Sequence, residues 1–430
     1  MWRPARTPTS TLAAACDLAI AIAVAALVGC ARGAAPRHDV PAPAAADVRV
    51  ARVSLGVMTG ATLSATGAWQ LSDGAGRVVV RGDSGDRITV SASGGVLRIG
   101  PREALDGDAI TPPLRLATTA REAAVSVNGR RYRGGFSLAP TDSGVQVINH
   151  VGVEAYLRGV VPRELGVRSS AEQAALEAQA VAARSYAMVR LANASRAFDL
   201  VATTGDQVYG GVDAENAIAD AAIAATQGLV LYYGDRIVSA PYFSTCGGST
   251  AQPDEVWRER GEPFLQRVSD RIPGTDRYYC DIAPRFRWER AWSGDTLTAV
   301  IERYLRAYTR GAAAVPAGAI RGISIEGRTV SGRVAGIRID TERGSYRVQG
   351  NDVRYVLRSP GGEMLNSTYF SPDVVEGPDG RVARLTLRGL GYGHGVGMCQ
   401  WGAIGRARAG QDFRTILRTY YPGTTVARAY

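Results

Sequence analysis

The chain has 430 residues, of which 46% are hydrophobic and 21% charged, a composition typical of a globular protein with room for about two or three domains. All 50 basic residues are arginine, and the net charge of +10 favours anionic partners such as nucleic acid, anionic lipid or a cell-wall polymer. The sequence has neither an arginine-rich arm nor the aromatic and basic motif of a nucleic-acid module, so we expect no nucleic-acid partner.

The first residues have the features of a bacterial export signal. Arg3 and Arg6 precede the twelve apolar or small residues LAIAIAVAALVG, which are too few to span a bilayer, since a span takes about 20 residues. The segment ends in LVGC, which resembles a lipobox and implies cleavage before Cys30 and acylation of its thiol. We therefore expect a lipoprotein signal peptide at 1–29 and an exported protein anchored to a membrane of the cell envelope. A signal peptide cut elsewhere, or an uncleaved anchor, is the alternative.

A tether and a β-rich region follow. Residues 30–47 are rich in alanine and proline, a composition typical of a linker. From Val48 to about Gln146, short runs such as VRVARVSLG, RITVSASGG and VLRIG alternate between apolar and polar residues and are separated by glycine or aspartate. This period of two predicts strands, and we expect a small antiparallel β domain without a cluster of reactive residues.

From Val147 the pattern becomes mixed. A β-like run and Pro162 are followed by a loop, and a helix is predicted after Ser169, which has capping-box spacing with Glu172. Apolar residues recur at helical spacing at Leu176, Ala180, Ala183, Ala187 and Leu191, and the alanines allow close packing against neighbouring elements. A second helix is predicted around Asp295–Arg310, between further strands. The sequence therefore predicts an α+β fold with the alanine-rich helix at its centre.

Two short segments carry candidate catalytic and sugar-binding residues. Glu164 follows the β-like run and precedes the capped helix, and catalytic acids often lie on such loops; the alternative is an exposed loop glutamate. The turn TTGDQVYGG brings Asp206, Gln207 and Tyr209 close together. This segment is either a sugar-binding loop or a turn capped by its aspartate.

Three cysteines remain after the signal peptide and Cys30, namely Cys246, Cys280 and Cys399. In an exported protein we favour a disulfide between Cys246 and Cys280, whose loop of about 35 residues would stabilise the fold by ~4 kcal/mol. The alternative is a zinc site formed by the three cysteines and His394, although no CxxC pair supports it. A nucleophilic pair of Cys399 and His394 would lack an orienting third residue.

Glycines occupy every second position of the segment from Gly389 to Gly397, GLGYGHGVG. In an extended chain this pattern leaves one face without side chains, so that another backbone or a ligand can approach closely. The segment matches neither GxGxxG nor a GKS or GKT sequence, which argues against a nucleotide-binding loop. We interpret it as the floor of a groove, with tight core packing as the alternative.

Eight further motifs occur in an order typical of one bacterial family: VNGRRYRG, VGVEAYLRGVVPREL, ALEAQAVAARSYA, DQVYGG, FSTCGGST, SGRV, GHGVGMCQWGA and ILRTYYPG. From about Val125 to Pro422, the chain resembles the SpoIID/LytB family of sporulation and cell-wall proteins. The resemblance implies a SpoIID-like α+β domain at 125–425 after a β-rich region at 48–124. It also implies a peptidoglycan lytic transglycosylase acting on glycan strands stripped of stem peptides, with Glu164 as the catalytic residue, in PREL rather than the more usual Glu-Met-Pro.

The resemblance also bears on a cofactor. Some family members hold zinc through His and Cys near the CGG segment, but Phe243-Ser244 replaces the histidine-containing version here. We therefore expect no cofactor, with zinc as the alternative.

A single glutamate suffices for the implied reaction. It protonates the leaving oxygen and then takes a proton from the C6 hydroxyl of muramic acid, so no second carboxylate is needed. Its pKa should be raised toward roughly 6 by an apolar wall, for which Val160, Val161 and Leu165 are candidates. The residues expected to bind the glycan strand are Arg184, Asp206, Gln207, Tyr209, Ser244, Thr245, His394 and Gln400.

Two other functions stay open at this point. LytB-like members are described as amidase modifiers, so the chain would be a glycan-binding enhancer of an N-acetylmuramoyl-L-alanine amidase, with Glu164 dispensable. A hydrolase would instead pair Glu164 with Asp206. The products separate these functions: 1,6-anhydro ends indicate a transglycosylase, reducing ends a hydrolase, and no cleavage a binding protein.

Overall fold

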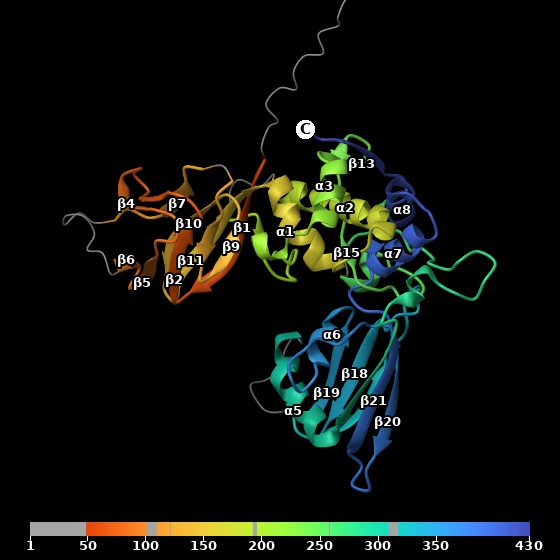
Figure 1. Cartoon of the computed structure of the whole chain (residues 1–430). Coiled ribbons are helices and arrows are strands. Elements are labelled where there is room, and N and C mark those ends of the chain that lie inside the picture. Colours follow the sequence, from red (N-terminus) through yellow and green to blue (C-terminus); the bar gives the residue numbers. More distant parts are fainter. Residues whose placement is uncertain (1–48, 101–109, 121, 192–195, 258, 309–316) are drawn as a thin grey trace, which may run out of the picture. The chain divides into compact units, whose positions relative to one another are not determined.

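The computed structural model describes residues 49–100, 110–120, 122–191, 196–257, 259–308 and 317–430 (Figure 1). The expected signal peptide, Cys30 and the tether lie outside the described residues. Helices and strands are mixed along the chain, which confirms the predicted α+β class. Residues Asp47–Tyr430 form one unit that contains two hydrophobic cores.

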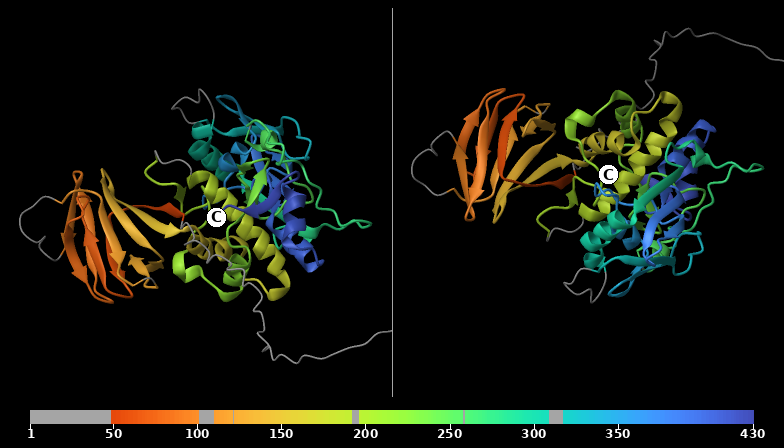
Figure 2. Two further views of the ribbon diagram at one scale, coloured as in Figure 1. Left: turned by 90° about the horizontal axis from the view of Figure 1, so that it is seen from above. Right: turned by 90° about the horizontal axis from the view of Figure 1, so that it is seen from below.

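The N-terminal region consists of two sheets, whose strands other than the short β12 are drawn in red-orange to yellow-orange in Figures 1 and 2. The first has the strand order β12 (Leu200–Val201), β1 (Val50–Met58), β11 (Gly144–Gly152), β10 (Gly135–Thr141), β7 (Leu114–Thr118), β3 (Trp69–Ser72) and β4 (Val78–Gly82). The second has the order β6 (Val96–Gly100), β5 (Ile88–Ser93), β2 (Gly60–Ala65), β8 (Val125–Val127) and β9 (Arg130–Tyr132). The sheets contact one another through β10 and β11 on one side and β2, β5 and β6 on the other.

The predicted alternation explains this packing. In β2, Ala61, Leu63 and Ala65 are buried while the residues between them are partly exposed, so one face covers the core. All pairs within the two sheets are antiparallel except β1 with β12. Strands from both sides of the expected boundary at residue 125 pair with one another, since β2 pairs with β8 and β1 with β11. That boundary therefore runs through both sheets.

The strand β11 leads directly into the first helix, α1 (Val153–Leu165). The β-like run expected before Glu164 is therefore wrong, because this segment is helical. Its buried residues include Val153, Tyr156, Leu157, Val160 and Val161, which follow the helical spacing of three and four. Pro162 lies inside the helix and does not end it before Leu165.

The predicted alanine-rich helix is confirmed as α2 (Gln173–Leu191), which follows a short 3-10 turn, η1 (Ser170–Glu172). The carboxylate of Glu172 accepts a hydrogen bond from the backbone N–H of Ser169 at 3.2 Å, which is half of the predicted capping box. Helix α2 contacts α1 and three others, α3 (Ala217–Ala225), α7 (Gln400–Arg408) and α8 (Phe413–Tyr420), so it is the central helix. Two small sheets complete this part: β14 (Arg236–Ile237), β13 (Leu229–Tyr233) and β23 (Thr425–Arg428), and the parallel pair β15 (Tyr242–Phe243) and β22 (Met398–Cys399).

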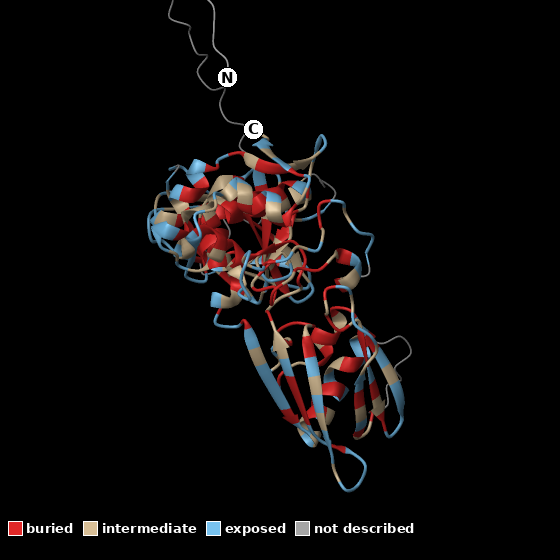
Figure 3. Ribbon diagram, turned by 90° about the vertical axis from the view of Figure 1, so that its right-hand side faces the viewer, coloured by how far each residue is buried: buried red, intermediate tan, exposed pale blue. Residues whose placement is uncertain are grey.

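The second hydrophobic core lies among elements of residues 287–390 (Figure 3). It is formed by two three-stranded sheets, β16 (Arg287–Ser293), β21 (Val382–Leu390) and β20 (Phe370–Glu376), and β17 (Ile320–Ile325), β18 (Gly336–Thr341) and β19 (Gly344–Gln349). The predicted second helix appears as α5 (Gly294–Tyr304) and the 3-10 turn η4 (Leu305–Tyr308), of which Leu297 and Ile301 are buried. The remaining short helices are α4 (Pro253–Val256), α6 (Asp352–Val356), η2 (Gly211–Ala214) and η3 (Tyr279–Ile282).

Candidate active site

A cavity of about 1270 Å³ lies where segments distant in the sequence meet. Its lining comes from the end of α1, from α2, from the turn at 204–207, from β15, and from α6 and the start of α7. Of the predicted site residues, the structure brings the following to this lining: Glu164, Asp206, Gln207, Ser244, His394 and Gln400. It does not bring there Arg184, Tyr209 and Thr245.

Glu164 lies in the last turn of α1 rather than on a loop, and its side chain is half-buried in the cavity wall. One carboxylate oxygen accepts a hydrogen bond from the backbone N–H of Val208 at 2.7 Å, and the side chain of Gln400 also donates to the carboxylate. Among the described residues, no arginine nitrogen lies within 4.0 Å of it. Burial raises the pKa of Glu164 above its usual value, while the two hydrogen bonds oppose this shift. The direction of the predicted shift is confirmed.

Asp206 has a different environment. One of its oxygens accepts hydrogen bonds from the Tyr186 hydroxyl at 2.8 Å and from Arg190 at 2.9 Å. The other accepts from the backbone N–H of Val201 at 2.8 Å. Both oxygens are thus held by protein donors, so the carboxylate fixes the turn to α2 and is poorly placed to activate a water molecule.

Five other predicted substrate-binding residues are buried, with exposed fractions between 0% and 6%: Arg184, Gln207, Tyr209, Thr245 and Gln400. Arg184 pairs with Glu154 at 2.8 Å, and the Tyr209 hydroxyl donates to Asn149 at 2.9 Å. Gln207 lies at the inner surface of the cavity, where its amide accepts from Tyr156 and donates to Tyr242. These side chains brace the helices and the sheet behind the cavity.

The glycine-rich segment is not an extended strand, contrary to the expectation. Gly391, Gly393, Gly395 and Gly397 all have positive φ, between 76° and 114°, and glycine adopts this conformation without strain. A Cβ at Gly397 would lie 2.0 Å from the carbonyl oxygen of Pro241. The missing side chains therefore admit neighbouring backbone, and most of this stretch is tightly packed. Gly393, between Tyr392 and His394, also contributes to the cavity lining.

His394 projects from this segment to the cavity lining. Its Nε2 lies 2.9 Å from the carbonyl oxygen of Tyr242 and its Nδ1 accepts from the backbone N–H of Val396 at 3.1 Å, an arrangement that fixes the Nε2–H tautomer. Burial lowers the pKa of His394 to about 3, so the ring is neutral at physiological pH. Both ring nitrogens make hydrogen bonds within the protein, and through them the ring fixes the backbone of its own segment against β15.

Sequence reasoning missed most of the cavity's aromatic and basic lining. The aromatic residues are Tyr186, Tyr242, Phe243, Trp257, Phe264, Tyr355, Tyr392 and Trp401. The described lining also includes seven arginines and four carboxylates, the arginines being Arg163, Arg168, Arg190, Arg236, Arg260, Arg285 and Arg354. Only Arg190 and Arg236 of these have a carboxylate oxygen within 4.0 Å in the described part of the chain. Several lie within the quoted motifs, such as Trp401 in GHGVGMCQWGA and Phe243 in FSTCGGST, and this position is the signal that would have found them.

Comparisons with known proteins identify the family of the chain. The model of the stage II sporulation protein family matches residues 141–233, which span α1, α2 and the turn with Asp206, and a domain of unknown function matches residues 275–397. An uncharacterized protein of Brachyspira hyodysenteriae is 32% identical over 305 residues, covering 70% of this chain and 73% of that protein. The chain belongs to the SpoIID family.

Two further SpoIID relatives come from Bacillus subtilis. The stage II sporulation protein D is 29% identical over 301 residues, which cover 66% of this chain and 77% of that protein. The amidase enhancer is 31% identical over 290 residues, which cover 63% of this chain and 40% of the enhancer. Within the described residues, no helix of this SpoIID chain is long and apolar enough to cross a membrane.

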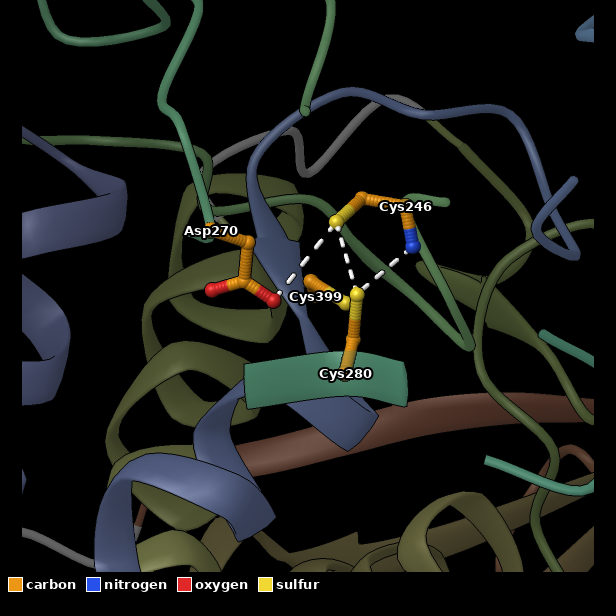
Figure 4. Close-up of side chains that lie close together, drawn as sticks. All are labelled: Cys246, Asp270, Cys280 and Cys399. Carbon is orange, nitrogen blue, oxygen red and sulfur yellow. Dashed lines mark hydrogen bonds between the residues drawn. The ribbon is translucent and has the colours of Figure 1, made fainter. Parts of the chain in front are cut away.

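The three cysteines in the described part of this SpoIID chain, Cys246, Cys280 and Cys399, lie behind the cavity wall, and none of them lines the cavity. Together with Asp270 they form a buried group, which we call the cysteine–aspartate cluster (Figure 4). The sulfurs of Cys246 and Cys280 are 3.3 Å apart and are not bonded, so their disulfide stays a prediction. The fourth member is Asp270 and not His394, whose two nitrogens are engaged elsewhere. Phe243, which stands where the family resemblance implied a histidine ligand, offers no ligand atom.

Proposed function

We propose that this chain is an exported peptidoglycan lytic transglycosylase that uses Glu164 first as an acid and then as a base. The observation that carries the proposal is the state of that carboxyl group. It lines a large cavity, its pKa is raised by burial, and it has no cationic partner within 4.0 Å among the described residues. A raised pKa keeps a larger share of the group protonated, as a general acid requires.

The reaction needs only this one carboxyl. Its proton passes to the glycosidic oxygen as the bond from that oxygen to C1 of the muramic acid breaks. The resulting carboxylate then accepts the proton of the C6 hydroxyl, whose oxygen bonds to C1 and closes the 1,6-anhydro ring. A hydrolase would need a second carboxylate for water, and Asp206 has donors on both oxygens.

The cavity lining supports a glycan strand without stem peptides as the substrate. Each muramic acid of such a strand carries a free lactyl carboxylate, and arginines without a carboxylate partner line the cavity. Aromatic rings such as Trp257 and Trp401 offer apolar faces to the C–H surfaces of sugar rings. Gln400 and Ser244 supply hydrogen-bonding groups beside Glu164.

The names of the relatives support a role at the cell wall and a location in the cell envelope. We propose that the mature chain begins at Cys30 and is held at a membrane by its lipid. Replacing Cys30 by serine should then release the protein from membranes or leave the precursor unprocessed, as fractionation and mass measurement would show. Unchanged fractionation and mass would contradict the lipid anchor.

One relative favours a second function. The amidase enhancer matches this chain at 31% identity, although the chain covers 40% of it. On this alternative the cavity binds glycan without cleaving it, and the partner is a cell-wall amidase. Glu164 would then be dispensable.

The decisive experiment is digestion of denuded and of peptide-bearing glycan by the full chain, with mass analysis of the product ends. We expect 1,6-anhydro ends from denuded strands, and their loss in Glu164→Gln. Glu177→Gln is the matched control, because burial also raises the pKa of Glu177 but this residue lies on α2 outside the cavity. Reducing ends would indicate a hydrolase. No cleavage of either substrate, together with faster release of peptides by an added amidase, would establish the enhancer.

A further inference from the structure

The four side chains of the cysteine–aspartate cluster are arranged as ligands are around a metal ion. Cys246, Asp270, Cys280 and Cys399 are all buried, and each offers one atom to a group whose members lie within 4.8 Å of one another. The sulfurs of Cys246 and Cys280 are 3.3 Å apart, and the Cys246 sulfur lies 3.6 Å from an oxygen of Asp270. Thiolates around a tetrahedral zinc ion are separated by about 3.8 Å, because each Zn–S bond is about 2.3 Å.

The cluster connects three separate segments, as Figure 4 shows. Cys246 comes from the loop after β15, Cys280 from the turn η3, and Cys399 from the residue that precedes α7. The three sulfurs and the Asp270 carboxylate point toward one another in the close-up. The cluster is shielded from solvent, since each of the four residues has an exposed fraction of 0%.

Two backbone N–H groups are directed at one of the sulfurs. Cys399 Sγ accepts hydrogen bonds from the N–H of Cys246 at 3.1 Å and from the N–H of Gly402 at 3.3 Å. A neutral thiol is a weak acceptor, whereas an ionised sulfur accepts such bonds well, and thiolates are the form in which cysteine binds a metal.

The Asp270 carboxylate is oriented by residues behind it. Its Oδ1 accepts hydrogen bonds from the Tyr420 hydroxyl at 2.7 Å and from Arg406 at 3.1 Å. Its Oδ2 is the oxygen that faces the Cys246 sulfur. Ligand carboxylates are typically held in this way, with one oxygen fixed by outer hydrogen bonds and the other free for the metal.

The charges around the cluster distinguish a metal from a disulfide. Arg333 and Arg406 have exposed fractions of 2% and 7%, and Arg333 has no carboxylate oxygen within 4.0 Å among the described residues. Its guanidinium donates to the carbonyl oxygens of Cys246 and Ser249, at 3.0 and 3.1 Å, so it lies beside the cluster. Three thiolates and one carboxylate around Zn²⁺ leave two negative charges in excess, which balance the two buried arginines. A disulfide between Cys246 and Cys280 would leave Asp270 as the one charged carboxylate in the cluster, with Glu255 acting on Arg333 from beyond 4.0 Å, and buried cations with too little counter-charge are disfavoured.

From this geometry we infer that Cys246, Asp270, Cys280 and Cys399 bind a structural zinc ion. Four protein ligands close the coordination shell, which is typical of structural and not of catalytic zinc. The ion would fix two segments of the cavity wall to one another. Ser244, a lining residue, lies two residues before the ligand Cys246, and Gln400, another lining residue, directly follows the ligand Cys399. This inference stands apart from the proposed function, since a zinc-stabilised wall would serve a binding protein equally well.

The test is made on the full chain, purified without chelators, by elemental analysis of zinc and by counting thiols in the unreduced, denatured protein. We expect one zinc per chain and, after denaturation, free thiols at Cys246, Cys280 and Cys399, assigned by peptide mapping because Cys16 and Cys30 also contribute thiols to the full chain. A mercurial reagent should release the zinc as it modifies the native protein. Replacement of the zinc by Co²⁺ should give sulfur-to-cobalt charge-transfer absorption and the intense visible bands of a tetrahedral site. A bridged Cys246–Cys280 peptide, or three thiols without zinc, would overturn the inference.

Variants identify the ligands. Cys399→Ser and Asp270→Asn should weaken zinc binding at least about tenfold in competition with a chelator. His394→Gln is the control for metal content, because His394 is absent from the cluster, and it should retain one zinc per chain. If a ligand variant fails to fold, the cobalt spectrum of the unchanged chain still decides whether three sulfurs bind the metal. Unchanged affinity in Asp270→Asn would exclude the carboxylate as a ligand.

Discussion

The cavity wall around Glu164 and the cysteine–aspartate cluster are neighbours in the fold but differ in how their charges are satisfied. The cavity has more arginines than carboxylates in its described lining, and Glu164 has one backbone and one side-chain donor. The cluster has four ligand atoms directed at one another, enclosed by two buried arginines and a tyrosine. The cavity is an open site with excess positive charge, which suits a substrate that binds and dissociates. The cysteine–aspartate cluster is a closed site, which suits an ion that stays bound. The difference shows that two polar groups within one core can have separate roles.

The largest expected effect concerns the open site. Glu164→Gln keeps the shape and one hydrogen-bond acceptor but loses the transferable proton. Acid and base catalysis contribute about 10²–10⁴-fold each, so the loss of both roles should lower the rate of anhydro-end formation by about 10⁴-fold or more. Product analysis over time measures this, with thermal melting as the check on folding. A variant that keeps most of its cleavage would place the catalytic carboxyl elsewhere.

The next largest effect concerns the closed site. Arg333→Met leaves the carbonyl oxygens of Cys246 and Ser249 without their donor and removes a counter-charge of the cluster. We expect a loss of about 3 kcal/mol in the free energy of unfolding. Denaturant unfolding measures it, and Arg285→Met, an exposed arginine of the cavity rim, should change stability by less than about 0.5 kcal/mol. Equal effects of the two variants would contradict the contrast between the two regions.

A smaller effect is expected at the second carboxylate of the cavity. Asp206→Asn weakens the pair with Arg190 and loosens the turn that supplies Val208 to Glu164. Because this residue positions rather than reacts, cleavage should fall by no more than about 10²-fold. The rate of anhydro-end formation, compared with that of Glu164→Gln, is the measurement. If Asp206→Asn were inactive while Glu164→Gln kept its activity, Asp206 and not Glu164 would be the catalytic carboxylate.

The smallest effect is on stability as a function of pH. The folded pKa of Glu164 is raised above the unfolded value of about 4.3, so folding favours the protonated form. The stability that protonation contributes is present below the unfolded pKa and is lost as pH rises through the folded pKa. Melting of Glu164→Gln should therefore match that of the parent in acid and exceed it slightly at neutral pH. For Asp213→Asn, where hydrogen bonds from Arg131 help to lower the carboxyl pKa, the sign should be opposite.

The sequence was sufficient to predict the helices and strands whose apolar residues recur at a clear spacing. The central helix α2 and the alternating strand β2 appear where the spacing of apolar residues predicted them. Helix α1 was missed although Val153, Tyr156, Leu157, Val160 and Val161 follow helical spacing. Valine and proline suggested a strand and a break, but tertiary burial outweighed those local preferences.

The site was predictable only in part, for a physical reason. The motifs led to Glu164, Gln400 and the three cysteines, because unusual residues in short segments are visible in a sequence. Tyr209 looks the same in a sequence whether it faces a ligand or the core, and the fold places it against Tyr156. Asp270 carries no local signal either, since its role depends on three cysteines that come near it only in three dimensions.

The parallel pair β15–β22 has a consequence for the order of folding. Residues 242–243 pair with 398–399, so the strand beside the cavity acquires its partner only when the last part of the chain is in place. Closing the loop between these two strands costs conformational entropy before the new contacts stabilise the chain, so such contacts form late and slowly. Cavity and cluster should thus mature together in the final steps of folding, and a chain truncated before α7 should lack both.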